Sequence, residues 1–562
     1  MVPAHRYYYL RNFQRALTWV DERYGDLLDD VESGFIAQFF RLPELSQALL
    51  ARLLMRRGPW FRASTLHYDE IPEIMSAARP LLRLGWLQER HPMRLDELFA
   101  LHTKSELLQL FHGTSVHARM RKPEMLEQLL PSYGTPRPYT EWTAQTSETA
   151  WRVTVDKLCE RLRLMFFGNL HQQWSEFVLA DLGIFKYEAV NFDAASRAFK
   201  TRADVDAYLN LQTCRLALDE GADVDHLLLE VERCDSPNLW IQARHAKLLW
   251  RIGQACERVQ DWRRAEQAYA RSNHPGARHR RIRVYERMGR VPDAMALAAA
   301  AMDAPESEEE SQRIARMLPR LRRHLGLGQE QRTSPPDFVR YPEIALELEP
   351  PNTPAPVEYA VRQHWHAESA PVFYVENALI NSLFGLLCWP AIFAALPGAF
   401  FHPFQNGPAD LGAADFAHRR AKQFGACLDT LDDGSYREII WRTYKDKQDI
   451  QSPFVFWGVL NDDLIKLSLD FIPASHLRAF FGRLLQGVRA NRSGLPDLIR
   501  FWPAENRYEM VEVKGPGDRL QDNQIRWLQF CMAQGIPVRV CHVRWSKRSG
   551  AMAGHATVVD PA

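Results

Sequence analysis

The sequence predicts a multidomain, mainly helical protein that ends in an α/β domain. Its 562 residues exceed what a single hydrophobic core usually organises, so several domains are expected. Apolar residues recur at helical spacing over the first 330 residues, whereas a region near the end alternates as strands do. With 46% apolar and 25% charged residues, the composition is that of a folded protein.

Composition and charge exclude few functions. The net charge is +1, and only 12 of the 70 basic residues are Lys, an excess of Arg that suits phosphate binding. A GC-rich bacterial genome explains the same excess, and the abundance of Ala favours that explanation. The eight cysteines form no CxxC pair, which argues against structural zinc and disulfides. No signal peptide and no run of about 18 apolar residues is found, so we expect a cytoplasmic protein without a membrane span.

The N-terminal part, residues 1–95, is predicted to be a helical domain. The segment PELSQALLARLLMR (43–56) has the spacing of an amphipathic helix. Residues 47–89 fit a small winged-helix unit or a plain helical bundle, and the bundle is favoured.

Residues 96–150 carry two predicted short helices that flank a basic loop. One helix begins near Thr103 and the other near Lys122, each with a Glu in its first turn. The pair resembles a SAP domain, which would bind duplex phosphates through Arg119, Arg121 and Lys122. A purely structural helix pair is about equally consistent with this spacing.

Residues 151–330 are predicted to form a helical domain with tetratricopeptide-like repeats, beginning with a long apolar helical segment over 154–192. Segments 248–272 and 281–302 both read as helix, turn, helix, with a period of about 30 residues. A basic cluster that begins just before the second segment suggests contact with a phosphate backbone, although a run of charges usually marks a solvated helix face. The cluster consists of Arg278, Arg280, Arg281, Arg283, Arg287 and Arg290. The proline-rich stretch 303–358 is interpreted as a linker or extended arm.

One α/β unit is predicted over residues 494–543. Its elements are two strands, a helix and a third strand: Asp497–Trp502, Tyr508–Lys514, Leu520–Gln534 and Pro537–Val543. Because side chains alternate along a strand, Glu512 and Lys514 should share one face of the second strand.

The acidic and basic residues of these strands suit phosphodiester hydrolysis. Asp497 and Glu512 would supply carboxylates for Mg²⁺ or Mn²⁺, which activates water and neutralises phosphate charge. Lys514 would orient the water or oppose developing charge. Pro496-Asp497 followed by Glu512-Val513-Lys514 is the PD-(D/E)xK pattern, which is weak alone. Its position on adjoining strands makes it more specific.

This segment resembles the virus-type replication-repair nuclease (VRR-NUC) domain, and most of the chain resembles the bacterial Fanconi-associated nuclease family. Upstream, ENALINSLFGLLCW (376–389) is similar to the family's active-site helix, placed here at 375–388. The SAP-like module, the FVLADLG segment (177–183) and the repeats follow in family order. The resemblance implies a nuclease domain over 331–562 with a restriction-endonuclease-like mixed sheet.

The resemblance also implies the residues of the site. It assigns the metal ligands Glu376, Asp497, Glu512 and the Val513 carbonyl, the catalytic residues Lys514 and Gln524, and two Mg²⁺ or Mn²⁺ ions. It places Arg489, Arg492 and Arg519 near the DNA. Without it, Glu376 would be interpreted as an acid that stabilises a helix N-terminus. Asn523 replaces a lysine that binds a 5′-terminal phosphate in some relatives, which leaves that pocket in doubt.

The implied activity is cleavage of 5′-flap or branched double-stranded DNA, as endonuclease and 5′-to-3′ exonuclease, in interstrand crosslink repair. The implied protein is a monomer of the bacterial cytoplasm, associated with the nucleoid when bound to DNA. Two alternatives stay open. A Holliday-junction resolvase or restriction-type endonuclease would share the carboxylates but act as a symmetric dimer. A non-catalytic DNA or partner scaffold would use only the helical repeats.

Overall fold

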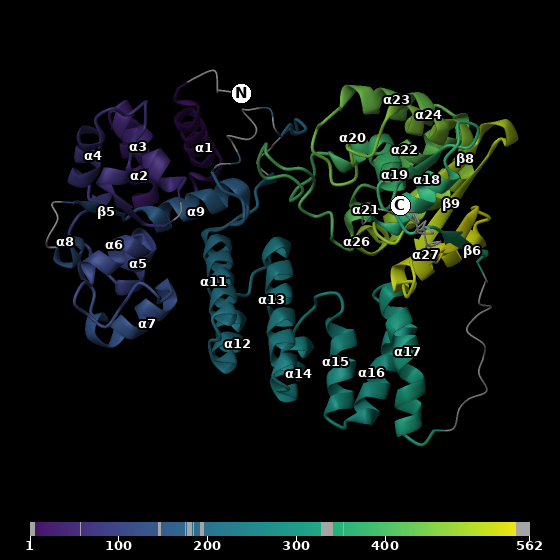
Figure 1. The fold of residues 1–562 in the computed structure, drawn as a ribbon, viewed down its shortest axis with the longest axis horizontal. Coiled ribbons are helices and arrows are strands. Elements are labelled where there is room, and N and C mark those ends of the chain that lie inside the picture. The colour runs from purple at the N-terminus through teal and green to yellow at the C-terminus, as the bar shows by residue number, and fades with distance from the viewer. Residues whose placement is uncertain are drawn as a thin grey trace, which may run out of the picture. The chain divides into compact units, whose positions relative to one another are not determined.

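The computed structural model describes residues 6–327 and 341–546, except 57, 144–147, 175, 177–182, 184, 192–195, 352 and 354 (Figure 1). The FVLADLG segment therefore lies almost entirely outside the described residues. The chain forms two compact units. The first comprises Met1–Asn210, Ser236–Ile241 and Phe400–Gln405, and the second comprises Leu211–Asp235, Gln242–Ala399 and Asn406–Ala562.

The first unit begins with helices and a small sheet. Its first four helices are α1 (Tyr8–Tyr24), α2 (Asp30–Arg41), α3 (Glu44–Leu54) and α4 (Ile74–Arg83). Strands β1 (Trp60–Arg62) and β2 (Leu87–Gln88) both pair antiparallel with β5 (Ala150–Val153). The favoured bundle interpretation missed this sheet. Strands of two or three residues have no recognisable periodicity, and their partner β5 lies far along the chain.

The SAP-like module has the predicted helix pair. It contains α5 (Leu95–Leu101), α6 (Lys104–Leu110), α7 (Lys122–Tyr133), α8 (Tyr139–Trp142) and the short pair β3 (Pro92–Met93) and β4 (Arg137–Pro138). Thr103 caps α6, and the Glu106 carboxylate accepts the Thr103 N–H at 2.7 Å. Leu98, Leu107 and Met125 form the centre of a core between the helices.

Helix α9 (Asp156–Phe167) is shorter than the predicted segment 154–192. It ends because Gly168 adopts a left-handed conformation, with φ of +67°. A Cβ atom there would lie 2.6 Å from the Phe401 ring, so only glycine fits this close approach.

The middle of the chain is a row of paired helices. They are α11 (Arg202–Asp219), α12 (Val224–Glu232), α13 (Leu239–Arg258), α14 (Trp262–Ala270), α15 (Ala277–Arg287), α16 (Val291–Asp303) and α17 (Glu308–His324). The predicted helix-turn-helix pairs correspond to α13–α14 and α15–α16. Apolar side chains of α15, α16 and α17, among them Ile282, Ala298 and Ile314, form one core.

A mixed five-stranded sheet forms the C-terminal core, as predicted. Its strands are β6 (Glu343–Leu348), β7 (Val372–Tyr374), β8 (Leu498–Trp502), β9 (Arg507–Lys514) and β10 (Val538–Trp545), in the order β6-β10-β9-β8-β7. Strand β10 is parallel to β6 and β9, whereas β8 is antiparallel to β7 and β9. Helix α27 (Asp522–Ala533) is the crossover that the parallel pair β9–β10 requires. Val511 and Val513 pack toward α18 (Val357–Trp365).

The linker interpretation of residues 303–358 was wrong for much of that stretch. It contains α17, β6 and the start of α18. The first turn of α17 is acidic, with Glu308, Glu309 and Glu310 directly after the N-cap Ser307. Strand β6 was overlooked although its residues alternate, with Ile344, Leu346 and Leu348 on the face that packs into the core.

The remaining helices surround α19. They are α19 (Leu379–Leu387), α20 (Trp389–Ile392), α21 (Phe416–Arg419), α22 (Ala421–Asp433), α23 (Tyr436–Asp446), α24 (Asp462–Phe471), α25 (Ala474–Gln486) and α26 (Val488–Asn491). Every residue of α19 is buried, and Phe384 packs against Phe424, Phe454 and Phe481. Over the described residues, no helix combines the length and apolarity required to cross a bilayer.

Candidate nuclease site

Asp497 lies directly before β8 and is fixed by the strands on both sides. Its Oδ2 accepts the N–H of Val513 at 2.7 Å, and its backbone carbonyl accepts the N–H of Val375 at 2.7 Å. The carboxyl is buried. The sheet therefore holds Asp497 between β9 and the turn that follows β7.

Glu512 is the most deeply buried acid of the site, with no exposed surface. Its Oε1 accepts hydrogen bonds from Lys514 Nζ at 2.7 Å and from Gln524 Nε2 at 2.5 Å. Its Oε2 is also buried but has no hydrogen-bond partner among the described residues. Leaving such an atom unsatisfied costs about 1–3 kcal/mol or more. This oxygen is therefore suited to a ligand.

Glu376 lies in the turn before α19 and does not open the helix, contrary to the prediction. Asn377 has φ of +50°, outside the helical region, and α19 begins at Leu379. The Asn377 side-chain carbonyl accepts the N–H of Leu495 at 3.1 Å, which ties this turn to the segment before Asp497. Glu376 is exposed, and its Oε2 accepts the Tyr374 hydroxyl at 2.5 Å.

The buried carboxyls repel one another. Burial and then the Glu512 charge raise the pKa of Asp497 to about 8. Burial raises the pKa of Glu512 to about 7, although Lys514 opposes that increase. The charges of Glu376 and of Glu358, which lies in the first turn of α18, raise the pKa of both Asp497 and Glu512 further. Asp497 and Glu512 therefore hold protons near neutral pH unless positive charge enters the site.

The donor set fits a hard divalent cation in its chemistry: carboxylate oxygens, a nearby backbone carbonyl and one orphaned buried oxygen. It is not closed around an ion. Within the described ranges, no three His, Cys, Asp or Glu side chains are close enough to hold one. The Glu376 carboxylate is held by the Tyr374 hydroxyl.

The raised pKa values predict a pH-dependent loss of stability without divalent cations. Because the folded-state pKa of Asp497 lies above its usual 3.8, its protonation stabilises the fold at low pH, and that contribution is lost as the pH rises toward about 8. In EDTA, Asp497→Asn should therefore unfold at a higher temperature than the wild type, with a difference that grows from pH 5 to about pH 8.5. Calorimetry at several pH values measures the two unfolding temperatures, and Ca²⁺ should raise only that of the wild type. A difference in unfolding temperature between the two proteins that does not change with pH would contradict this prediction.

The SAP-like module leaves two of its three predicted DNA-binding residues accessible. Arg119 and Arg121 are exposed. Lys122 instead serves the fold, because its Nζ donates to the carbonyls of Phe99 at 2.5 Å and His102 at 2.8 Å. Those carbonyls lie at the C-terminal end of α5, which no local sequence pattern connects to Lys122.

The basic cluster of α15 is largely neutralised. Arg278 pairs with Glu310, Arg280 with Glu257, Arg281 with Glu266 and Arg290 with Asp293, at 2.5 to 2.9 Å. The local sequence could not reveal this neutralisation, because α13, α14 and α17 bring acids from elsewhere in the chain. Arg283 and Arg287 stay exposed, with no ion pair found in the described part of the chain.

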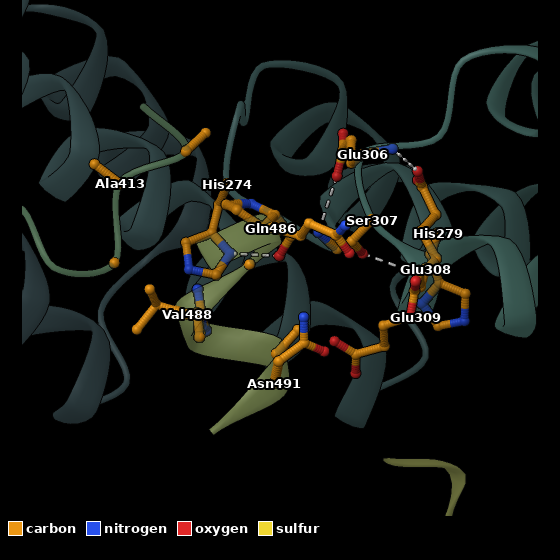
Figure 2. Close-up of a pocket in the computed structure, with 18 of the residues that line it drawn as sticks. His274, His279, Glu306, Ser307, Glu308, Glu309, Ala413, Gln486, Val488 and Asn491 are labelled. Carbon is orange, nitrogen blue, oxygen red and sulfur yellow. Dashed lines mark hydrogen bonds between the residues drawn. The ribbon is translucent and has the colours of Figure 1, made fainter. Parts of the chain in front are cut away.

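Arg489 lines a cavity of about 810 Å³ between the helical repeats and the segment around α26. Figure 2 shows His274 from the repeats and Gln486 from the end of α25 in its lining. Arg283 also lines it, and Arg489 is exposed. Burial and neighbouring arginines lower the pKa of His279, another lining residue, to about 4. The positive charge of this space therefore comes from arginine.

The other predicted DNA-binding positions differ in accessibility. Arg519 is exposed in the loop after β9. Arg492 is half-buried: its guanidinium donates to the Pro453 carbonyl and lies 5.0 Å from the Phe454 ring centroid. Asn523 donates to the Ser493 hydroxyl at 3.2 Å.

Sequence reasoning missed Tyr374 and Glu358 as neighbours of the site. Tyr374 bonds Glu376, and the Tyr359 ring next to Glu358 stacks on Tyr374 with centroids 5.3 Å apart. Alternation along β7 could have placed Tyr374 with Glu376. Nothing local could have found Glu358, which lies in the supposed linker.

A mixed sheet with one acid directly before β8 and the other on the neighbouring strand β9 defines the chain as a nuclease of the divalent-metal-dependent PD-(D/E)xK class. Three family models agree: the VRR-NUC domain matches residues 431–545, the FAN1 HTH domain 7–88, and the Fanconi anemia-associated nuclease SAP domain 92–142. The chain belongs to the Fanconi-associated nuclease family.

Several relatives match nearly the whole chain. The Fanconi-associated nuclease 1 homolog of Pseudomonas aeruginosa is 53% identical over 96% of both chains, and that of Arabidopsis thaliana is 25% identical over 95% of this chain and 67% of that protein. A crystal structure of paFAN1 bound to DNA with a 2-nucleotide 5′ flap and a gap is 52% identical. It has a TM-score of 0.93 and covers 97% of this chain and 100% of that one. The complex with a 1-nucleotide flap gives a TM-score of 0.91.

Proposed function

We propose that this protein cleaves branched DNA at 5′ flaps, as endonuclease and 5′-to-3′ exonuclease, in the repair of interstrand crosslinks. The observation that carries this is the pairing of buried Asp497 and Glu512 on the sheet, with a Glu512 oxygen that lacks a partner in the described structure. The relative with a TM-score of 0.93 was crystallised on 5′-flap DNA, which supports the substrate class.

The proposed cation site contains Glu376, Asp497, Glu512 and the Val513 carbonyl, and would hold two Mg²⁺ or Mn²⁺ ions. Such ions make bound water nucleophilic at neutral pH and oppose charge on the phosphate. Asp497 and Glu512 would give up their protons on binding such an ion, and Glu376 would have to leave the Tyr374 hydroxyl to join them.

Lys514 and Gln524 both contact the Glu512 carboxylate. Both donate to Glu512 Oε1, which leaves Oε2 available. Lys514 is the proposed catalytic cation, because its ammonium is buried beside the acids and can oppose charge on the attacked phosphate. Gln524 fixes the orientation of the Glu512 carboxylate.

Arginines outside the site would fix the path of the DNA backbone. The accessible candidates are Arg119, Arg121, Arg283, Arg489 and Arg519. Phosphate contacts of this kind position a duplex without reading its bases. Selectivity then follows from geometry, since a flapped or gapped duplex bends at lower cost than an intact one, for which bending costs on the order of 1–6 kcal/mol.

The substrate proposal is tested with a matched set of DNA molecules. Flaps of unrelated sequence should be cut at similar rates in Mg²⁺, and continuous duplexes of the same sequences at least about tenfold more slowly, because bending penalises them. Labelled strands resolved on denaturing gels give the rates. A strong preference for one base sequence that survives changes of junction shape would contradict the proposal. A dimer in solution with a preference for four-way junctions would favour the resolvase alternative instead.

A further inference from the structure

One face of α17 bonds directly to the helices of the catalytic core. Glu308, Gln312 and Arg316 are spaced by four residues and so share a face of the helix. Glu308 accepts from Arg483 of α25 at 2.6 Å, and Gln312 accepts from Arg526 of α27 at 2.6 Å. Arg316 pairs with Asp522 of α27 at 2.6 Å. We call these three residues the α17 stripe.

Arg483 transmits the Glu308 contact to α27. Its side chain is only 5% exposed, and its guanidinium lies 5.0 Å from the Trp527 ring and 4.5 Å from the Phe530 ring, both on α27. Glu308 is its carboxylate partner, with a second contact at 3.3 Å. Because a buried guanidinium needs a counter-charge, Glu308 holds Arg483 against α27. Figure 2 shows Glu308 in the lining of the cavity.

Helix α27 in turn orients Glu512. Gln524 is the third residue of the helix, and it lies two positions from both Asp522 and Arg526, the contacts of the stripe. Its side-chain carbonyl accepts the Gln521 N–H at 2.8 Å, while its amide donates to Glu512 Oε1. A change in the position or tilt of α27 would therefore change the hydrogen bond that directs the carboxylate.

We propose that the α17 stripe is a positioning element of the nuclease, through which the last repeat helix holds α27 and thereby aligns Gln524 and Glu512. The inference rests on the proposed role of Glu512. The inference also places the start of the functional nuclease before α17. A fragment that began at the predicted boundary, residue 331, would lack Glu308 and Arg316, the partners of Arg483 and Asp522.

The test uses the full-length protein and the triple variant Glu308→Gln, Gln312→Ala, Arg316→Gln. We expect kcat on flapped DNA at saturating Mg²⁺ to fall about tenfold or more, because loss of an aligned transition-state contact lowers kcat. Flap affinity in Ca²⁺ should stay within about twofold, because phosphate contacts elsewhere dominate it. The matched control is Arg320→Gln, one turn further along α17, where the arginine pairs with Glu286 of α15 instead. It should keep wild-type kcat.

A second pair of variants makes the test independent of folding. Arg316 and Asp522 are half-exposed, so Arg316→Glu is tolerated by the fold but repels Asp522. We expect it to lower kcat several-fold, and the added Asp522→Arg to restore most of the loss by re-forming the pair with reversed charges. Wild-type kcat in the triple variant, or an Arg316→Glu defect that Asp522→Arg fails to relieve, would overturn the inference. If Asp497→Ala also cleaved normally, the proposed site itself would be wrong. An inactive Asp497→Ala beside a fully active triple variant would reject the stripe alone.

Discussion

Glu512→Gln is expected to abolish cleavage of flapped DNA while leaving binding of the flap close to that of the wild type. The substitution preserves the size of the side chain and an oxygen that can accept from Lys514 and Gln524. It removes the negative charge that a divalent cation requires. Since the cation contributes several kcal/mol to phosphodiester hydrolysis, the single-turnover rate in Mg²⁺ should fall on the order of a thousandfold or more.

The matched control for this experiment is Glu509→Gln. Glu509 lies on the same strand three residues earlier, so it points to the other face, where it pairs with Arg539 at 2.9 Å. We expect that variant to cleave within about twofold of wild type, because a partly exposed ion pair contributes little. Affinity for flapped DNA in Ca²⁺ separates binding from chemistry. Cleavage by Glu512→Gln at even a tenth of the wild-type rate would show that Glu512 is not a metal ligand.

The parts of this site that the sequence predicts are those set by local pattern. Strands β8 and β9 and helix α27 begin and end within two residues of the predicted bounds. Strand alternation placed Glu512 and Lys514 on one face of the strand, and in the structure Lys514 Nζ lies 2.7 Å from Glu512 Oε1. These predictions succeeded because the periods of strands and helices depend on neighbours in sequence.

What the sequence could not predict depends on distant partners. Glu310 neutralises Arg278, and Glu257 neutralises Arg280, so a cluster that looks basic along the chain is paired in space. Lys122 looked like a DNA contact but donates to the end of α5. Glu376 was assigned to the site only through family resemblance, and the structure places it before the helix, next to Asn377 with its left-handed conformation.

Lys514→Met is expected to reduce kcat in Mg²⁺ by about a hundredfold to a thousandfold, the range for loss of one preorganised electrostatic group. Lys514 is nearly buried and donates to Glu512 at 2.7 Å. Methionine keeps most of the volume and removes the charge. Lys466→Met, at an exposed lysine of α24 that lies 5.4 Å from the Trp441 ring, is the control and should keep wild-type activity. Affinity for flapped DNA in Ca²⁺ should be unchanged in both variants.

The pH profile separates the electrostatic role of Lys514 from a structural one. Burial raises the pKa of Glu512 to about 7, and the ammonium of Lys514 is the group that limits this increase. Without Lys514 the pKa rises further, so protons compete with the cation up to higher pH. The acidic limb of log kcat/KM should therefore move toward alkaline pH in Lys514→Met, and Lys514→Arg should move it back, because guanidinium restores the charge. If kcat/KM fell equally at every pH and its acidic limb did not move, Lys514 would have a structural role in the site and not an electrostatic one.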